Sequence, residues 1–580
     1  MNKKSKKIGR PLLLALILSV ASITTVRAYT DNQIITIGQH TYKVVSAADF
    51  TLCFLSTTAT GNLIIPSTVD DGTDTHFTVT AVGGNSEYRS PGVTTVTIPE
   101  GVTTISTPSF AGARLTSIHL PSTLATYEHE TGFEWLSAPV FTVDQNNPHF
   151  ATDEQGALYS KDMKSLYSVP STVALDSNGA YTVNETVENI FQDAFLRNYS
   201  LKKIVLPPNL QSIELGFPTI TYGNESLQEF EVATGGNTPF RTIDGVLFHA
   251  NTLVDYPRGK TTTDYRVPDG ITAIAPYGIN DCQNLQNIDL NDIVNLNNAS
   301  ISNCPRLTSI TLPRNLEATA SMEGCFVGCY RVAQYIVPEG SANFTEADGV
   351  VYSKDMKTLY FYPPARQGTT YDIPESVTKI STYAFRRAQN IETIQIPKNV
   401  TEIGLHAFRG MPNLTTFTFA EPSTIRTFGS NILMECPKLR EVTLPTSLTY
   451  IDNAFARCYA LEVINIPDGS QLTTIQGSAF VTNTALRQFN FLGSSQLLTI
   501  GSNAFANLTK LQTFDVPKTV TDISANAFTG CSSLATVTFD DDAAIRNIRT
   551  GAFADCGLTT VTIPPASPPS RKKPSATVRF

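Results

Sequence analysis

The stretch of residues 394–458 decides the fold of this chain, because it repeats one pattern three times. Residues 394–411 read IQIPKNVTEIGLHAFRGM, residues 417–436 read FTFAEPSTIRTFGSNILMEC, and residues 442–458 read VTLPTSLTYIDNAFARC. Each copy starts with apolar residues at alternating positions, continues through a turn and a second short apolar segment, and reaches an Ala-Phe pair or its equivalent. Such internal repeats determine an architecture before any other feature of a sequence.

The period of the repeat can be counted through the second half of the chain. The last apolar residue of the first strand recurs every 22 to 25 residues, at Ile396, Phe419, Leu444, Ile466, Phe491, Val516, Phe539 and Ile563. The Ala-Phe position keeps the same phase, at Phe385, Phe408, Leu433, Phe455, Phe480, Phe505, Phe528 and Phe553. Units of about 20–29 residues with a Leu-x-x-Ile-x-Ile pattern are typical of leucine-rich repeats.

One repeat unit has too little apolar surface to form a core alone, so the units must stack and share one. In LEVINIP (residues 461–467), Leu461, Ile464 and Ile466 are expected to point inward, and Val463 and Asn465 outward, because strand side chains alternate between faces. The Ala-Phe element then begins a tight turn or a single helical turn, with Phe in the core. The pattern predicts a right-handed leucine-rich-repeat solenoid, rich in strands, with short helical or 3-10 turns.

The texts IPKNVTEIGLHAF (residues 396–408), LPTSLTYIDNAFARC (residues 444–458) and VPKTVTDISANAFTGC (residues 516–531) carry a family resemblance. The sequence resembles the BspA-like leucine-rich repeat proteins, a family of bacterial surface and secreted proteins, over nearly all of the chain after its N-terminal segment. The resemblance implies a non-enzymatic binding protein that adheres to host matrix proteins or to other bacteria. A structural cell-envelope protein without a ligand and a glycan-binding module for nutrient capture stay open as alternatives.

The first 28 residues have the pattern of a secretory signal peptide. Five basic residues between Lys3 and Arg10 precede a short apolar run at residues 11–20, and Val26-Arg27-Ala28 precedes the expected cut. Cleavage is therefore predicted after Ala28, which places the protein outside the cytoplasm, secreted or on the cell surface. The alternative is an uncleaved membrane anchor.

The charge of the chain argues against two classes of partner. The net charge is −9, and removal of residues 1–28 takes away six basic residues and changes it to −15. An acidic chain without a basic run is a poor ligand for nucleic acid or for anionic membranes. No later apolar run reaches the 18 or so residues of a membrane span, so no membrane insertion is expected after signal removal.

The predicted domain organisation has three further parts. Residues 29–90 contain short strand patterns without the full repeat and are the expected N-terminal β cap, which a solenoid needs over its first turn. Residues 91–565 form the predicted solenoid. It carries hairpin inserts at residues 156–170, 245–257 and 349–363, where two alternating apolar runs flank a polar tip.

Residues 566–580 (ASPPSRKKPSATVRF) depart from the repeat and predict an irregular tail. One allowed codon spelling of this tail, read one nucleotide out of step, translates as SVTSIAEEAFSNC, which continues the repeat in register. Many third bases in that spelling are chosen freely, but most second and third bases of the shifted codons follow from the protein sequence. We therefore hypothesise that the reading frame is lost near residue 565 and that the parent gene encodes more repeats.

Sequencing the genomic locus across codon 565 tests this hypothesis. We expect the shifted frame to continue with further repeat units beyond the present stop codon. A stop after Phe580 with no repeat text in any downstream frame would contradict it.

The sequence offers no recognisable catalytic, cofactor or metal site. Seven Cys recur three residues after the Phe-type position and indicate a ladder inside the solenoid, at Cys282, Cys304, Cys329, Cys436, Cys458, Cys531 and Cys556. Buried free thiols are the expected state of this ladder, and disulfides between neighbouring turns are the alternative. A Gly-x-Ser-x-Gly elbow is missing, and Gly259-Lys260-Thr261 lacks the earlier Gly of a phosphate loop.

The outward strand positions remain as the candidate partner-binding face. They are polar, mostly uncharged and poor in the Trp, Tyr and Arg anchors of interface hot spots. The face comprises Thr393, Gln395, Thr416, Thr418, Glu441, Thr443, Asn465, Gln488, Asn490, Thr513 and Asp515. It would bind a protein or glycan on a host or bacterial surface, or else Thr is simply a favourable residue of exposed strands.

The cleavage site gives a direct prediction about export. When the full chain is expressed in a bacterium that exports proteins, N-terminal sequencing of the exported product should start at Tyr29. A product that keeps Met1 and stays with the membrane fraction would support the uncleaved anchor instead.

Overall fold

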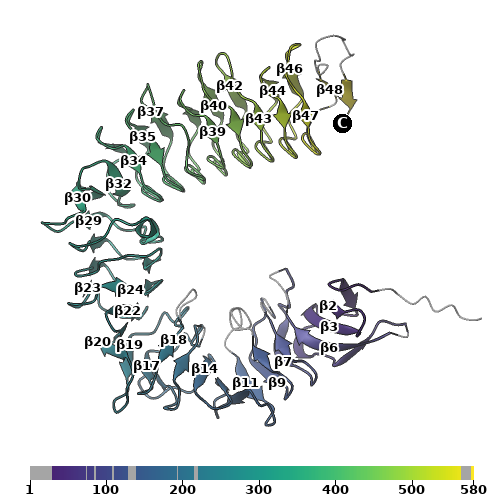
Figure 1. Ribbon diagram of the computed structural model, residues 1–580, viewed down its shortest axis with the longest axis vertical. Helices are drawn as coiled ribbons and strands as arrows, with labels where there is room; N and C mark the ends of the chain where they lie inside the picture. Colours follow the sequence, from purple (N-terminus) through teal and green to yellow (C-terminus); the bar gives the residue numbers. More distant parts are fainter. Residues whose placement is uncertain are drawn as a thin grey trace, which may run out of the picture. The chain divides into compact units, whose positions relative to one another are not determined.

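The computed structural model describes residues 29–73, 75–83, 87–106, 110, 112–127, 139–192, 194–214, 220–558, 560–563 and 576–579. The predicted signal peptide and residues 564–575, at the start of the predicted tail, lie outside the described residues. The chain divides into two compact units, residues 1–162 and residues 163–580. Almost all regular structure is extended, as the repeat pattern predicts (Figure 1).

The first unit begins with antiparallel strands and continues with parallel ones. Its first sheet has the order β1 (Ile34–Ile37), β2 (His40–Ser46), β3 (Thr51–Thr57), β6 (His76–Val82), β8 (Thr104–Ile105), β10 (Thr126–Tyr127), with β5 (Thr68–Asp70) beside β6. Its second sheet has the order β11 (Val140–Val143), β9 (Ser117–Leu120), β7 (Val93–Thr97), β4 (Gly61–Ile64). A hairpin of β12 (Phe150–Thr152) and β13 (Leu158–Ser160) follows. Parallel pairing already begins at β3 and β4, within the segment predicted as the cap.

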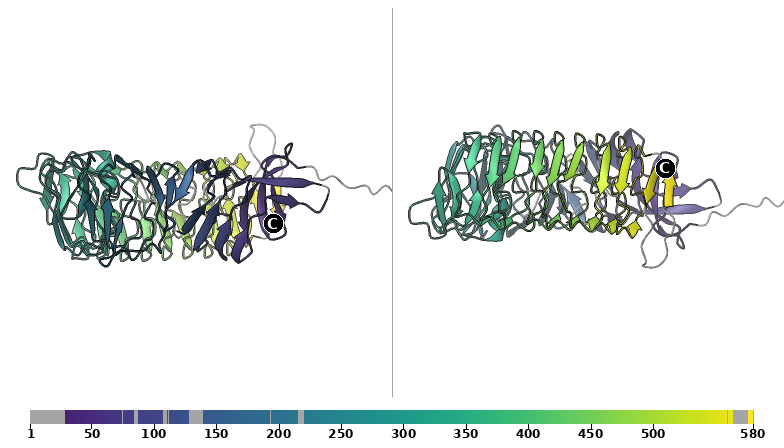
Figure 2. Two further views of the ribbon diagram at one scale, coloured as in Figure 1. Left: turned by 90° about the horizontal axis from the view of Figure 1, so that it is seen from below. Right: turned by 90° about the horizontal axis from the view of Figure 1, so that it is seen from above.

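The second unit contains two kinds of parallel ladder, because each repeat supplies one longer strand and one short one. The longer strands are β15 (Ala180–Thr182), β17 (Lys203–Leu206), β19 (Glu229–Val232), β23 (Asp264–Arg266), β26 (Asn287–Asp289), β28 (Ser309–Thr311), β29 (Gln334–Ile336), β33 (Thr370–Asp372), β35 (Thr393–Ile396), β37 (Thr416–Phe419), β38 (Glu441–Thr443), β40 (Val463–Ile466), β42 (Gln488–Phe491), β44 (Thr513–Val516), β46 (Thr536–Phe539) and β48 (Thr560–Ile563). Figure 2 (right) shows the green to yellow members of this set as a row of parallel arrows.

The second ladder runs through the Val/Leu-Thr-x-Ile segments. Its strands are β16 (Asn189–Ile190), β18 (Ser212–Ile213), β24 (Ala273–Ile274), β34 (Lys379–Ile380), β36 (Glu402–Ile403), β39 (Tyr450–Ile451), β41 (Thr474–Ile475), β43 (Thr499–Ile500), β45 (Asp522–Ile523) and β47 (Asn547–Ile548). β14 (Ser165–Ser168), from the first predicted hairpin insert, pairs in parallel with β16. One more short parallel pair, β25 (Ile279–Asn280) and β27 (Ile301–Ser302), joins two neighbouring turns. The Ile of each segment points inward and shares the core with the longer strands.

Two hairpin inserts of the second unit have one strand more than the sequence predicts. β20 (Phe240–Ile243), β21 (Val246–His249) and β22 (Thr252–Asp255) form an antiparallel meander, as do β30 (Phe344–Ala347), β31 (Val350–Ser353) and β32 (Thr358–Phe361). The last strand of each meander pairs in parallel with the next short strand of the solenoid. The inserts are therefore built into the wall of the solenoid.

Four residues of the predicted tail are described by the structure, and they form a strand. β49 (Ala576–Arg579) pairs antiparallel with β48. An unpaired strand edge is an open hydrogen-bonding template, so a returning strand satisfies it without any repeat pattern of its own.

The Ala-Phe elements are tight turns, not helical ones, in the regular part of the second unit. Two residues per turn, two before and two after the Phe-type position, have positive φ, which is incompatible with a continuing helix. These pairs are Tyr383 and Arg387, His406 and Gly410, Asn431 and Glu435, Asn453 and Arg457, Ser478 and Thr482, Asn503 and Asn507, Asn526 and Gly530, and Gly551 and Asp555. Within the described residues the one helical element is the 3-10 helix η1 (Ala320–Gly324).

The Phe residues of successive turns stack on one another and form the centre of the core. Ring centroids lie 5.3 Å apart between Phe455 and Phe480, 5.5 Å between Phe480 and Phe505, 5.0 Å between Phe505 and Phe528, and 5.2 Å between Phe528 and Phe553. The ring planes within these pairs are inclined by 5° to 13°. All five rings are buried. Each Phe therefore packs in the core of its own turn and also against the core of the neighbouring turns.

This shared core predicts a large effect of a single truncation. Phe505→Ala should lower the free energy of unfolding by about 3–5 kcal/mol, because it removes a buried ring and leaves a cavity between two turns. Chemical denaturation followed by circular dichroism measures the loss. Tyr459→Ala, at a side chain that is 54% exposed, is the matched control and should change stability by about 0.5 kcal/mol or less. Equal denaturation midpoints for the two variants would contradict a shared Phe core.

Candidate functional site

The structure places the predicted face on the longer strands of the second unit. Thr393, Gln395, Thr416, Glu441, Thr443, Gln488, Thr513 and Asp515 are exposed, and Thr418, Asn465 and Asn490 are half-buried. Their neighbours along each strand, such as Ile394 and Ile464, are buried. The eleven residues thus share the outer face of strands β35 to β44.

Polar side chains on this face bond to one another along the ladder. Thr443 lies opposite Asn465, and Asn465 lies opposite Asn490. The Asn465 Nδ2 donates to Glu441 Oε1 at 2.7 Å, and the Asn490 Nδ2 donates to Asn465 Oδ1 at 2.9 Å. Amide groups in neighbouring turns therefore hold each other in a fixed orientation.

The ladder of the face is interrupted between β42 and β44. One parallel sheet runs through β33, β35, β37, β38, β40 and β42, and a separate sheet begins with β44 and β46. The interruption follows a strand with Phe at both inward positions, Phe489 and Phe491. Their rings pack 5.9 Å and 6.3 Å from the ring of Phe514 on the next strand, where most turns pack a smaller aliphatic residue.

A second double-Phe strand shows the same effect to a lesser degree. β37 carries Phe417 and Phe419 and pairs with β38 at one position, Thr416 with Glu441. The preceding pair, β35 and β37, has inward Ile residues on β35 and pairs at four positions. The hydrogen-bonded ladder thus weakens after β37 and ends after β42, and among the described residues it ends again after β46, which carries Val537 and Phe539 at its inward positions.

A groove of about 480 Å³ opens at the interruption. Its lining residues are Glu462, Ala485, Arg487, Gln488, Lys510, Gln512 and Thr513. Gln488 and Thr513 belong to the predicted face. The other five precede strands β40, β42 and β44 in loop segments, where strand alternation says nothing about side-chain direction.

The groove holds two cations in different electrostatic settings. The Nε and Nη2 of Arg487 donate to Glu462 Oε2 at 3.1 Å and 3.0 Å. Lys510 has no hydrogen bond or ion pair with any residue that the structure describes. With the amides of Gln488 and Gln512 and the hydroxyl of Thr513, the lining offers donors and acceptors for a polar ligand and one free positive charge.

The nine Cys are free thiols, and they have a structural role that sequence reasoning did not identify. The Cys531 Sγ donates to Phe505 O at 3.0 Å, and the Cys556 Sγ donates to Phe528 O at 3.1 Å. These two thiols bind a Phe carbonyl of the preceding turn, and the Cys458 Sγ donates in the same way to Leu433 O at 3.0 Å. Burial raises the pKa of the Cys458 thiol well above its ordinary value, so it keeps the proton that its bond needs.

Metal and membrane sites were also sought in the described part of the chain. No group of three or more His, Cys, Asp or Glu side chains in these residues is arranged to hold a metal ion. No helix formed by the described residues is long and apolar enough to cross a membrane.

Comparison with known proteins identifies one family. The family model for the BspA type leucine-rich repeat region, in six copies, matches residues 80–131, 177–235, 258–362, 354–486 and 452–568. No curated protein matches the chain.

Solved structures of bacterial leucine-rich repeat proteins are also similar to the chain. A protein from Eubacterium ventriosum has 16% identity and a TM-score of 0.38, and the match covers 86% of this chain and 94% of that one. A leucine-rich cell surface protein from Faecalibacterium prausnitzii has 20% identity and a TM-score of 0.36, covering 80% and 96%. A leucine-rich repeat protein from Bacteroides ovatus has 18% identity and a TM-score of 0.26, covering 90% and 92%.

Proposed function

Because this chain belongs to the BspA-type leucine-rich repeat family, we propose that it is an exported, non-enzymatic adhesion protein that binds a surface ligand on its polar strand face. The family assignment confirms the resemblance seen in the repeats. The export, the adhesion and the ligand are parts of the proposal. The observation that carries it is the groove beside the starts of β42 and β44, because it is a concave site that includes two residues of the polar strand face.

The size and lining of the groove support ligand binding. Its volume lies in the range of about 300–1,000 Å³ that is common for ligand sites. Its polar lining continues into the ordered amides of Asn465 and Asn490, so an elongated polar ligand would contact several turns. Neighbouring strands are spaced about 4.8 Å apart, and a six-strand row therefore spans roughly 24 Å.

The lining of the groove fits an extended segment of a protein ligand. Gln488, Gln512 and Thr513 offer donors and acceptors for peptide groups. Lys510, which has no ion pair among the described residues, adds a preference for an acidic side chain of that ligand.

We expect saturable binding of the full chain to an immobilised matrix protein, measured by surface plasmon resonance against collagen, fibronectin and laminin. Thr513→Arg places a long side chain in the groove and should weaken this binding about tenfold or more by steric exclusion, which outweighs the attraction of the added positive charge for an acidic ligand. Ser533→Arg adds the same charge at an exposed turn residue outside the groove and should bind like the wild type.

Other outcomes separate the alternatives. Signal on a glycan array without binding to protein would replace the adhesion proposal with glycan capture. Equal loss in both Arg variants would contradict a role of the groove. Absence of saturable binding to any protein or glycan surface would support a structural envelope protein without a ligand.

A further inference from the structure

The hairpin insert at residues 344–361 interrupts the ladder of Phe turns. In the regular repeats, each turn donates main-chain bonds to the next one, as Phe385 N does to Ala407 O at 2.7 Å. Val327 O still accepts a bond from Asn303 N of the preceding turn at 3.0 Å. Its own N–H, however, bonds within its turn to Gly324 O at 3.4 Å. The turn at residues 325–329 therefore has no regular successor.

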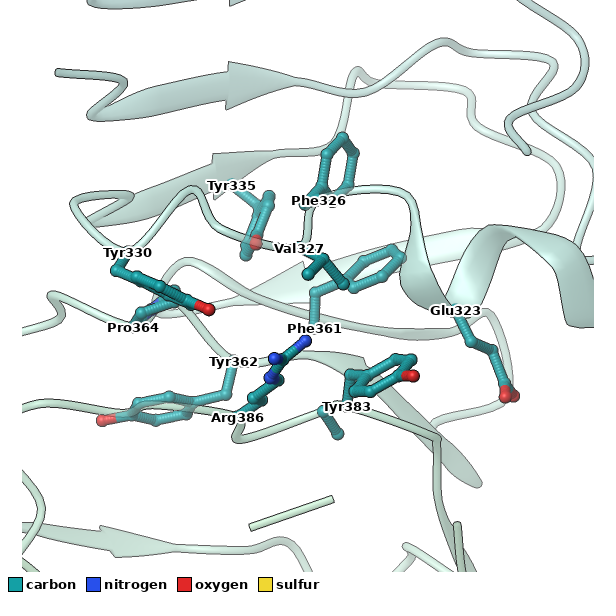
Figure 3. A pocket seen from close by; sticks show the side chains of 11 residues that line it. Glu323, Phe326, Val327, Tyr330, Tyr335, Phe361, Tyr362, Pro364, Tyr383 and Arg386 are labelled. Carbon is teal, nitrogen blue, oxygen red and sulfur yellow. The ribbon is translucent and has the colours of Figure 1, made fainter. Parts of the chain in front are cut away.

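A small pocket occupies the place of the missing turn. It lies between the turn at residues 325–329 and the turn at residues 383–387, and the end of the hairpin supplies Phe361, Tyr362 and Pro364 (Figure 3). Aromatic rings form much of its wall: the Phe326 and Phe361 centroids are 5.1 Å apart, and those of Tyr335 and Phe361 are 5.5 Å apart. The pocket shares no residue with the groove on the strand face.

One cation points into this aromatic pocket. Figure 3 shows the guanidinium of Arg386 between Tyr330 and Tyr383, and its Cζ lies 5.2 Å from the centroid of the Tyr383 ring. The Arg386 Nε is buried and has no acceptor among the described residues. Arg409 in the next turn, by contrast, pairs with Glu435 at 3.1 Å. The adjacent Arg387 does not line the pocket, and its Cζ lies 5.1 Å from the centroid of the Tyr330 ring.

The other ionisable groups around the pocket leave this positive charge uncompensated. Glu323 also lines the pocket, yet it forms no ion pair with Arg386, and Figure 3 shows its carboxylate directed away from the guanidinium. His406 stacks on Tyr383 with centroids 5.3 Å apart. Burial, with the positive charges of Arg409 and Arg386, lowers the pKa of His406, so its ring is neutral at pH 7. Arg386 is therefore the cation that faces the space.

The pocket volume limits what can enter. It is about 30 Å³. A single water needs about 10–15 Å³ by the same kind of measure, so the space admits a group of two or three heavy atoms. A carboxylate has this size, and an arginine guanidinium binds carboxylates with planar, bidentate geometry. A sugar ring is too large to enter.

We propose that this pocket binds the carboxylate of a glutamate side chain from an acidic peptide segment of a protein partner. The carboxylate fills the pocket and pairs with Arg386, and the narrow methylene stem of the glutamate connects it to a peptide backbone that stays outside. The ring of an acidic sugar cannot approach as closely, because it is too large for the pocket. The site is independent of the function proposed for the strand face.

Fluorescence anisotropy of the full chain with labelled peptides tests this proposal. The probe is a peptide of Ser-Gly-Glu repeats, and the reference peptide has Gln in place of each Glu. The wild type should bind the Glu peptide at least tenfold more tightly than the Gln peptide. Since the chain is acidic overall, nonspecific charge attraction works against this result.

Two variants and one control locate the binding. Arg386→Gln should weaken binding of the Glu peptide about tenfold or more. Arg386→Lys should weaken it less, because lysine keeps the positive charge but cannot form the bidentate pair with a carboxylate. Arg331→Gln removes the same charge from an exposed residue close to the pocket and should bind like the wild type. Circular dichroism melting verifies that all variants fold.

Three results would overturn the proposal. Equal affinity for the Glu and Gln peptides would exclude carboxylate recognition, and equal loss in the Arg386 and Arg331 variants would exclude the pocket. Binding of oligogalacturonate in preference to the Glu peptide would assign the pocket to an acidic glycan. A failure of the strand-face experiment leaves each of these readouts unchanged.

Discussion

The structure depends on one constraint: no turn of this chain can bury its apolar face alone. Each Phe ring completes its burial only by stacking on the Phe of the neighbouring turn, with centroids about 5 Å apart between Phe480, Phe505 and Phe528. The same constraint explains the polar interior. The thiol of Cys531 satisfies Phe505 O of the turn before it, where an unpaired carbonyl would cost about 1–3 kcal/mol.

Both candidate binding sites arise where this stacking becomes irregular. At β42, a strand with Phe489 and Phe491, the ladder ends, and a groove opens beside the segments that precede β42 and β44. At residues 344–361, a hairpin takes the place of a turn and leaves a space in front of Arg386. In a fold made of equivalent units, such departures provide concave surface that a regular stack lacks.

The sequence was sufficient to predict the fold, the period, the outward residues and the burial of the Cys ladder. Leu461, Ile464 and Ile466 repeat with a regularity that only a shared core explains, and their burial follows. The groove was only half predicted, through Gln488 and Thr513. Arg487, Lys510 and Gln512 lie in loops, where neither strand alternation nor helical periodicity constrains the side chain. The Arg386 pocket was missed, because it joins residues from two turns and an insert between them.

The sequence by itself determined the repeat architecture, because the repeat period and the alternation of apolar and polar residues are local properties that recur in every unit. It also determined the family, since the family model matches the repeat residues themselves. Tertiary structure alone decided where the ladder separates and which charges remain unpaired. These outcomes depend on side chains from different turns that lie next to one another. Phe491 packs against Phe514 of the next turn, and the Arg386 Nε has no hydrogen-bond acceptor among the described residues. The sequence pattern of a single repeat does not contain this information, because the contacts join residues of different repeats.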